Sequence, residues 1–497
     1  MDLSTLRRQA AGLFRDLALA ERDRWTSVRG GIDLRSTFAP FAALTSAEAF
    51  ACAREELDRA PAEQKSSARA SLGLVLEAME GSRLARWDAE LWAFDSSASV
   101  VIDGARLPVR VVPRRLANEP VRGLRSRIAL AFEGSLVRLD ATLSHRVEER
   151  VELAGELGFA SYDALRTVAS GVDLAALSAE AQATLDSTED AWRDLFDFGL
   201  RKVVGKHALQ PHGEAALHDL ERFCRLEPLD DLFKARRLLP SAQAFLEAMG
   251  LSASGDGSIE VIDEDVLKPG ARAIAIEVPS EICVVLGRVG GAQDHSALFH
   301  ALGVAHQRAA TSRELPIELR RSGELAAPES FGALFEQLLC DQDFLRRFLD
   351  ADARDAIEAA RLCAIERLSR LRRACADLCY QRTLFAEGPR EELRGLYRES
   401  LQKALAVDVP VQRWLWDEAT RSRPETELRS LALAEVLRRA LLEQANEDWW
   451  RNPRAGALLK RVAVRGGRDA AEAIAKELSV PLTLAGAAGR LVEIAAR

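Results

Sequence analysis

The sequence is poor in aromatic residues, and tyrosine is the scarcest of them. Aromatic residues make up 6% of the 497 residues, and only three are tyrosine. Alanine, leucine, arginine and glutamate are abundant instead, and these residues favour helix. The chain is 48% hydrophobic and 29% charged, which is enough apolar surface for a sizeable core. The composition therefore predicts a folded, mainly α-helical protein.

The sequence also lacks an excess of positive charge and long apolar runs. The formal net charge is -8, whereas nucleic-acid binding needs a basic surface, so we expect no nucleic-acid partner. No apolar run reaches the ~18 residues of a membrane span, and the first residues have an amphipathic helical pattern, so we expect no membrane contact and a cytoplasmic location. The basic run at 367–373 is interpreted as the solvated side of a helix.

The cysteines do not form the pattern of a disulfide-rich protein. There are seven, an odd number, scattered from Cys52 to Cys379. Cys375 and Cys379 lie one helical turn apart, a spacing that suits a metal site or a redox pair as well as a helix core. Because no second pair of ligands lies near them in the sequence, we predict buried core cysteines.

Two short regions interrupt the helical periodicity. The first, near 97–112, has β-branched runs on both sides of Asp103-Gly104, which predicts a β-hairpin. The second, at 271–289, predicts two short strands. A helix at 295–310 follows them, and Asp294 is the expected N-cap of that helix.

We predict a mainly α, two-lobed, zincin-like helical fold with a small β-sheet beside a cleft. The N-terminal helical lobe covers 1–199 and contains the hairpin. The second lobe covers 200–497 and contains the two strands and the helix that follows them. We find no internal repeat and no low-complexity segment.

The helix after the two strands carries histidines without the spacing of a zinc site. Zinc peptidases place two histidines four residues apart on one helical face, with a glutamate directly after the first as the base. After His300, Ala301 occupies the position of that base and Val304 the position of the second ligand. His306 lies about 120° around the helix from His300, and His295 about 140°. The sequence therefore supplies one histidine where two are needed.

Several segments resemble a known family. "VPSEICVVLGRVGGAQDHSALFHALGVAHQRA", followed by "GELAAPESFGALFEQLL", resembles the core of the thimet oligopeptidase and oligoendopeptidase F family of zinc peptidases, and in particular a bacterial branch of it. "PVRVVPRRLANEPVRGLRSRI", "LGFASYDALRT" and "ANEDWWRNPRAGALLKRV" resemble the same branch. The order and spacing of these segments carry the resemblance, because no single segment is specific.

The resemblance implies a deep cleft in which short peptides bind against the edge of a small sheet. Such edge pairing recognises the peptide backbone. The first zinc-binding histidine of the family corresponds to His300, and its third ligand, a glutamate, corresponds to Glu329. The two strands would form the edge of the cleft, with Ala275, Ile282 and Val284 expected there together with His300 and Glu329.

The departures from the family concern its base, one of its zinc ligands and its oxyanion donors. The catalytic glutamate of the family corresponds to Ala301, and its second zinc histidine corresponds to Val304. Active relatives also carry tyrosines that stabilise the oxyanion on a late helix, but the matching segment, 423–437, has none. Loss of the base or of one ligand removes most of the activation of a metal-bound water.

Three hypotheses follow for the function. The first is a pseudopeptidase with no cofactor, which keeps a peptide-binding cleft or binds a protein partner. The second is an active zinc metallopeptidase that cleaves short peptides with an unusual ligand set: His300, Glu329 and either His306 or His295. It requires a distortion of the helix near Gly303. The third is a helical scaffold with no peptide site.

Overall fold

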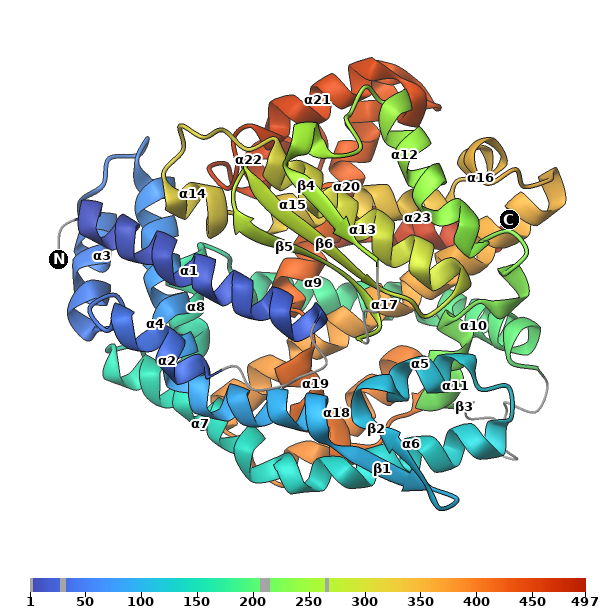
Figure 1. Cartoon of the computed structure of the whole chain (residues 1–497), viewed down its shortest axis with the longest axis horizontal. Coiled ribbons are helices and arrows are strands. Elements are labelled where there is room, and N and C mark those ends of the chain that lie inside the picture. The colour runs from blue at the N-terminus through green and yellow to red at the C-terminus, as the bar shows by residue number, and fades with distance from the viewer. Residues whose placement is uncertain (1–2, 27–32, 206–214, 264–267) are drawn as a thin grey trace.

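The predicted mainly α fold is confirmed by the computed structural model, which describes residues 3–26, 33–205, 215–263 and 268–497. Helices form most of these residues, and the strands among them form three small sheets (Figure 1). None of the helices in the described part of the chain is long and apolar enough to span a membrane.

The first part of the chain is helical except for one hairpin. Its helices are α1 (Leu3–Thr26), α2 (Leu34–Phe38), α3 (Ala47–Arg59), α4 (Lys65–Ser97), α5 (Val112–Asn118), α6 (Arg122–Leu136), α7 (Asp140–Glu156), α8 (Tyr162–Ser170), α9 (Leu174–Ser187) and α10 (Glu189–Val203). The predicted boundary between residues 199 and 200 stays a prediction, and that position lies within α10.

The predicted hairpin is present but shorter than expected. Strand β1 (Ser99–Ile102) pairs antiparallel with β2 (Ala105–Pro108). At the turn, Asp103 and Gly104 both have positive φ, 51° and 84°, as a two-residue turn of type I′ requires. Residues after Pro108 turn into helix at once, so the second strand ends before residue 112.

The second part of the chain contains the main sheet and the longest helix. Its first elements are β3 (Ala215–Ala216), α11 (Leu217–Cys224), α12 (Leu238–Ala248), β4 (Ile259–Ile262), β5 (Gly270–Glu277), β6 (Glu281–Gly287), α13 (Gly291–Ala309), α14 (Ile317–Arg321), α15 (Ala326–Glu336) and α16 (Gln342–Phe348). Then come α17 (Ala353–Glu387), α18 (Leu393–Leu405), β7 (Val407–Asp408), α19 (Trp414–Thr420), α20 (Pro424–Ala445), α21 (Pro453–Ala463), α22 (Ala471–Glu477) and α23 (Leu484–Ala496).

The main sheet has three strands in the order β4-β6-β5. The predicted strands at 271–289 are β5 and β6, which pair antiparallel, while β4 was not predicted and runs parallel to β6. Helices cover both faces of the sheet (Figure 1). Cys283 and Val285 pack under α1, whereas Ile282 and Val284 join the main core on the side of α13. Strand β6 is therefore buried on both faces.

Helix α13 begins earlier than the predicted range 295–310. Its N-cap is Gly290, with φ of 131°, and the helix starts at Gly291. Asp294 is therefore not the N-cap. It lies in the first turn, and its carboxylate accepts hydrogen bonds from the backbone amides of Val289 and Gly290 at 2.7 and 2.9 Å. The consecutive glycines let the chain turn into the helix before Asp294, because both have positive φ.

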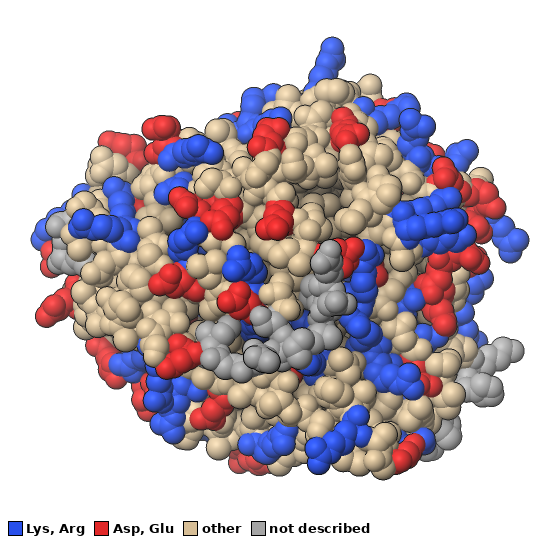
Figure 2. All heavy atoms as spheres, in the orientation of Figure 1, with Lys and Arg blue, Asp and Glu red and all other residues tan. Residues whose placement is uncertain are grey.

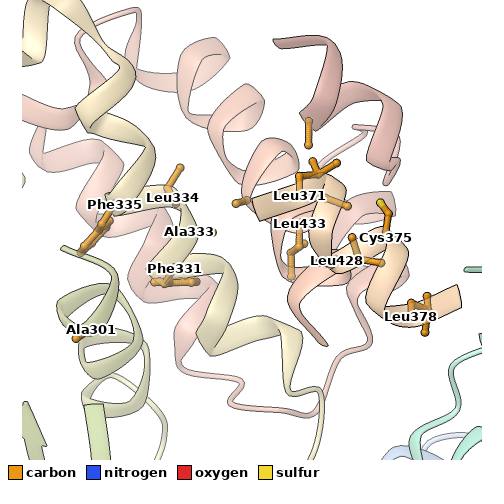
Figure 3. Packing of buried hydrophobic residues seen from close by; sticks show 14 of the residues in the cluster. Ala301, Phe331, Ala333, Leu334, Phe335, Leu371, Cys375, Leu378, Leu428 and Leu433 are labelled. Atoms are coloured by element: carbon orange, nitrogen blue, oxygen red, sulfur yellow. The ribbon is translucent and has the colours of Figure 1, made fainter. Parts of the chain in front are cut away.

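Helix α17 crosses the middle of the molecule and is buried along most of its length. Figure 3 shows its residues Leu371, Cys375 and Leu378 in the core beside Leu428 and Leu433 of α20. Cys375 is buried and Cys379 is partly buried, and none of the seven cysteines, all of which lie in the described ranges, forms a disulfide bond. The prediction of packed cysteines therefore agrees with their positions.

The interpretation of 367–373 as a solvated surface is wrong. Arg367, Arg372 and Arg373 are 7%, 0% and 8% exposed. The guanidinium of Arg372, for example, donates to the backbone carbonyls of Ala404 and Leu185 at 2.7 and 2.8 Å. Other helices surround α17, and these three arginines bond to partners on those helices.

Candidate functional site

Helices α13 and α15 approach each other so closely that glycine is required on both. A Cβ atom at Gly303 would lie 2.2 Å from the carbonyl oxygen of Phe331, and one at Gly332 would lie 2.8 Å from Nε2 of His300. No other residue type fits such distances without movement of the backbone or of the imidazole. The contact places the His300 ring directly against α15.

His300 lies between two glutamates of α15. Glu329, Gly332 and Glu336 are three and seven residues apart and so share one helical face. The Nε2 atom of His300 is 3.0 Å from Oε2 of Glu329, and its Nδ1 atom is 3.2 Å from Oε2 of Glu336. Each ring nitrogen therefore has its own carboxylate partner, on different sides of the ring.

Glu336 connects this pair to α17. Its carboxylate is 5% exposed and accepts bonds from Arg367 Nη1 at 3.0 Å and from Arg370 Nη1 at 2.8 Å. It also accepts a hydrogen bond from the hydroxyl of Ser296, one turn before His300 on α13. Arg370 in turn donates through Nε to Glu366 at 2.6 Å. Three helices thus meet at one carboxylate.

These contacts fix the charge of each group. Burial opposes protonation of His300, but the hydrogen bonds to Glu329 and Glu336 outweigh it and raise the pKa of His300 to about 10. Burial also opposes ionisation of Glu336, yet Arg367 and Arg370 hold the pKa of that carboxyl well below its usual range. The pKa of Glu329 is lowered, because its hydrogen bond to His300 outweighs burial. At neutral pH an imidazolium therefore lies between two carboxylates.

We call this set the His300 cluster, and its members are His300, Glu329, Glu336, Glu366, Arg367 and Arg370. Three cationic side chains in it face three carboxylates, so the formal charges cancel without any bound ion. Opposite charges that are paired and hydrogen-bonded in this way satisfy one another in a buried setting.

The two positions expected to be degenerate are aliphatic and buried. Ala301 is 2% exposed and Val304 is 9% exposed. Ala301 lies in the core with Phe331 and Phe335 of α15 (Figure 3). Val304 is one turn after His300 on α13, where a second imidazole would have to stand. Neither side chain can bind a metal ion or accept a proton.

The other histidines of α13 do not join His300. Helix α13 is continuous through Gly303, so the distortion that the unusual zinc site requires is not present. His306 packs with its ring 6.4 Å from that of Phe335, and burial lowers its pKa to about 4. His295 donates from Nδ1 to the carbonyl of Gly291 at 3.1 Å, and burial lowers its pKa to about 4 as well.

The donor groups near His300 do not fit a zinc ion. A zinc site in a protein has at least three protein ligands in tetrahedral geometry. At Nε2 of His300 only Glu329 stands close, and Glu336 binds the other ring nitrogen. In the described part of the chain, no group of three or more His, Cys, Asp or Glu side chains is arranged to hold a metal ion.

Comparison with known proteins identifies solved structures that have a similar fold. No family model matches the sequence, and no curated protein matches it. Solved structures do match: PZ peptidase A with an inhibitor, at 15% identity and a TM-score of 0.61, over 87% of this chain and 80% of that one. A Bacillus anthracis structure assigned as oligoendopeptidase F matches at 13% identity and a TM-score of 0.61. The match covers 96% of this chain and 84% of that one.

The M32 carboxypeptidase of Deinococcus radiodurans also matches, at 13% identity and a TM-score of 0.54, over 100% of this chain and 99% of that one. This chain has the fold of these peptidases. The resemblance inferred from the residues is thereby confirmed at the level of the fold. The peptidase fold surrounds a His300 cluster whose charges are already paired.

The residues expected to line a peptide cleft lie in different environments. The side chains of His300 and Glu329 are 34% and 41% exposed, so both reach solvent-accessible space. Ala275 is on the edge strand β5, and its carbonyl accepts a long hydrogen bond, 3.4 Å, from Arg321 Nη1. That carbonyl therefore points away from β6. Ile282 and Val284 are 1% and 0% exposed in the core, and their role in peptide binding stays a prediction.

The three tyrosines all lie in the core. Tyr162, Tyr380 and Tyr397 are 3%, 3% and 1% exposed. The hydroxyl of Tyr162 donates to Glu80 at 2.8 Å, and that of Tyr397 donates to Asp417. Helix α20, which contains the segment 423–437, places no tyrosine at the site.

Sequence reasoning found His300 and Glu329 but missed five other residues, among them Glu366, which pairs with Arg370. Ser296, Glu336, Arg367 and Arg370 all contact one another or His300. Two signals were available. Glu336 follows Glu329 by seven residues, which places it on the same helical face, and Glu366 precedes Arg370 by four, a spacing that favours an ion pair.

Proposed function

We propose that this protein is a pseudopeptidase, which binds short extended peptides in the cleft of an oligopeptidase fold and does not hydrolyse them. The single observation that carries the proposal is the His300 cluster. Both ring nitrogens of His300, the one histidine that corresponds to a zinc ligand, are already bonded to carboxylates. Ala301 occupies the position of the family's base, and Val304 occupies the position of its second zinc histidine.

The charge balance of the cluster supports a site without a metal. A zinc ion at Nε2 of His300 would first have to displace a proton from a group whose pKa is about 10. Nδ1, on the other side of the ring, is bonded to Glu336, which Arg370 also contacts. A divalent ion added to a set of charges that already cancels would leave unpaired positive charge in a partly buried region.

The absence of a base supports the lack of hydrolysis. A water molecule must be both positioned and deprotonated to attack a peptide bond. Ala301 can do neither, and the carboxylate of Glu329 is bonded to His300. The proposed function is therefore the binding of peptides without their hydrolysis.

The outer edge of β5 supports peptide binding. Residues of an antiparallel edge strand direct their N–H and C=O groups alternately inward and outward. Because the carbonyl of Ala275 points outward, Ala273 and Ala271 are expected to do the same. Small side chains along this edge leave space for an extended peptide, which would pair through its backbone. The cysteines, which form no disulfide bonds in the described ranges, support a reducing compartment, and the cytoplasm is the proposed location.

A combined metal and peptide assay tests this proposal. The purified chain is analysed for zinc, incubated with a library of short peptides that is read by mass spectrometry, and titrated into fluorescent members of that library. We expect substoichiometric zinc, no cleavage and saturable binding. Stoichiometric zinc together with turnover would support the active peptidase instead, and no peptide binding at all would support a scaffold.

A pair of substitutions at Ala273 tests the edge. Ala273→Pro removes an outward N–H group and leaves the bonds between β5 and β6 in place, because proline is tolerated on the open side of an edge strand. We expect it to weaken peptide binding by about tenfold, the effect of about one lost hydrogen bond. Ala273→Ser keeps the N–H group and is the matched control, with affinity unchanged. Equal affinity in both variants would place the peptide elsewhere.

A further inference from the structure

A second group of charged side chains lines a cavity and includes none of the residues of the His300 cluster. A surface cavity of about 480 Å³ is present between the start of α12 and the end of α16. Its walls include four arginines, one acid and one aromatic ring: Arg236, Arg237, Arg347, Arg451, Asp350 and Phe348. Figure 2 shows basic side chains gathered on the right-hand side of this face, where Figure 1 places α12 and α16.

The arginines of this cavity outnumber their acidic partners. Arg237 pairs with Asp350 at 3.1 Å, and Arg451 pairs through Nε with Asp448 at 2.6 Å. Arg236 and Arg347 form no ion pair with any residue that the structure describes. A local excess of positive charge in a chain of net charge -8 is not explained by the overall composition, and it attracts anions.

The cavity is held open by rigid elements. Phe348, on its wall, packs against Trp450 with ring centroids 5.6 Å apart and against Phe344 at 4.9 Å. The opposite wall is the regular helix α12. A wall of packed aromatic rings and a helix needs little reorganisation when a ligand binds, which lowers the cost of binding.

We propose that this cavity binds a compact polyanion, a small molecule with two or more phosphate or carboxylate groups. Guanidinium groups present several N–H donors in a plane and bind such groups with paired, charge-assisted hydrogen bonds. Two unpaired arginines on facing elements suit a ligand with two anionic groups better than a single monovalent ion. This proposal does not depend on the pseudopeptidase function.

Titration calorimetry at low ionic strength tests the proposal, because salt screens exposed charges. Pyrophosphate and citrate are the two probes, and sodium chloride at equal ionic strength is the reference. We expect saturable one-site binding of at least one probe. Binding of pyrophosphate alone assigns a phosphate ligand, binding of citrate alone assigns a carboxylate ligand, and binding of both assigns recognition by charge.

Three variants locate the site. Arg236→Ala combined with Arg347→Ala should weaken binding by at least about tenfold, the effect expected for lost charged hydrogen bonds. Asp350→Asn removes the acid of the cavity and should tighten binding by about threefold. Arg346→Ala is the matched control: it is on the same helix, is paired with Asp343 at 3.5 Å, does not line the cavity and should leave the affinity unchanged.

Two results would overturn the proposal. One is the absence of saturable binding of either probe by the wild-type chain. The other is an equal loss of affinity in the double variant and in Arg346→Ala, because that result would show general attraction to a basic surface and not a site. Circular dichroism of each variant confirms that the fold is kept, and the exposed positions of Arg236 and Arg347 make this the expected result.

Discussion

Around His300 each arginine lies against a carboxylate, whereas in the cavity between α12 and α16 two of four arginines have no acidic partner among the described residues. Both regions are rich in arginine, and both lie where helices meet. They differ in burial and in charge balance. In the His300 cluster three of the six side chains are no more than 7% exposed, the other three are 34–42% exposed, and the charges cancel. The cavity is open to solvent and keeps an excess of positive charge.

This difference separates structural charge from charge that is available to a ligand. Buried charges must be paired, since an unpaired ion in the interior costs several kcal/mol. Exposed charges are hydrated and can stay unpaired at little cost. The His300 cluster is therefore expected to exclude an added ion, and the cavity is expected to accept one. Each prediction below removes or exchanges a group in one region.

The largest expected effect is the restoration of a metal site in the His300 cluster. The double substitution Ala301→Glu with Val304→His would supply the base and the second imidazole one turn after His300. With His300 and Glu329 it completes a set of three ligands, and we expect zinc binding to rise from substoichiometric to about one ion per chain. Metal analysis after dialysis measures this change.

The control for this experiment keeps the new groups and removes the old histidine. The same double substitution combined with His300→Gln should bind no stoichiometric zinc. If the double variant itself, folded by circular dichroism, fails to bind zinc, then α13 does not hold His300 in the position of a zinc ligand, and the correspondence with the peptidase site is incorrect.

A smaller effect is expected when one acid is neutralised in each region. Glu336→Gln leaves His300, Arg367 and Arg370 without the carboxylate that they share. We expect a loss of about 3–5 kcal/mol in the free energy of unfolding, as for other broken buried ion pairs. Asp350→Asn changes a side chain that is 76% exposed, so the free energy of unfolding should change by less than about 0.5 kcal/mol. Urea denaturation measures both.

The order of these two effects is the result that matters. A loss of stability in Asp350→Asn as large as that in Glu336→Gln would show that the cavity arginines also depend on internal pairing. The contrast between a paired and an open region would then be unsupported, even if both variants fold.

The smallest expected effect is spectroscopic and concerns two histidines of α13. Because the pKa of His300 is raised to about 10, its proton stabilises the fold fully below about pH 6.5, the unperturbed value, and this contribution is lost as pH rises through about 10. His306 has a pKa lowered to about 4, so its neutral form stabilises the fold above about pH 6.5, and stability is lost as pH falls toward 4.

Imidazole chemical shifts in an NMR titration measure both values. We expect one resonance, absent in His300→Gln, whose chemical shift is that of a protonated imidazole at pH 8. A second resonance, absent in His306→Gln, should have the chemical shift of a neutral imidazole at pH 5. A His300 resonance that titrates near its unperturbed value would show that the bonds to Glu329 and Glu336 do not hold the proton there.

Much of the fold could be predicted because its signals are local. The hairpin was identified from Asp103-Gly104, since positive φ at consecutive turn positions depends only on these residues. The strands β5 and β6 were identified from the alternation of small and apolar residues that ends at Gly290 and Gly291. Strand β4, which like β1 and β2 has four residues, was missed because its parallel pairing with β6 joins segments that are not adjacent in sequence.

The burial of the basic run at 367–373 could not be predicted in the same way. Charge along a helix usually marks a solvated face. Here the surrounding helices supply partners such as Glu336 for Arg367 and the carbonyl of Ala404 for Arg372. The start of α13 was misplaced for a related reason, because Asp294 bonds backward to the turn and does not cap the helix.

The sequence by itself determined the helical class of the protein, the single histidine at position 300 and the aliphatic residues at 301 and 304, because residue identity and helical spacing are properties of one segment. Only the tertiary structure decided what His300 does. Its partners come from α15 and its charge balance from α17, and the pKa of a partly buried imidazole depends on groups that packing brings within a few ångströms.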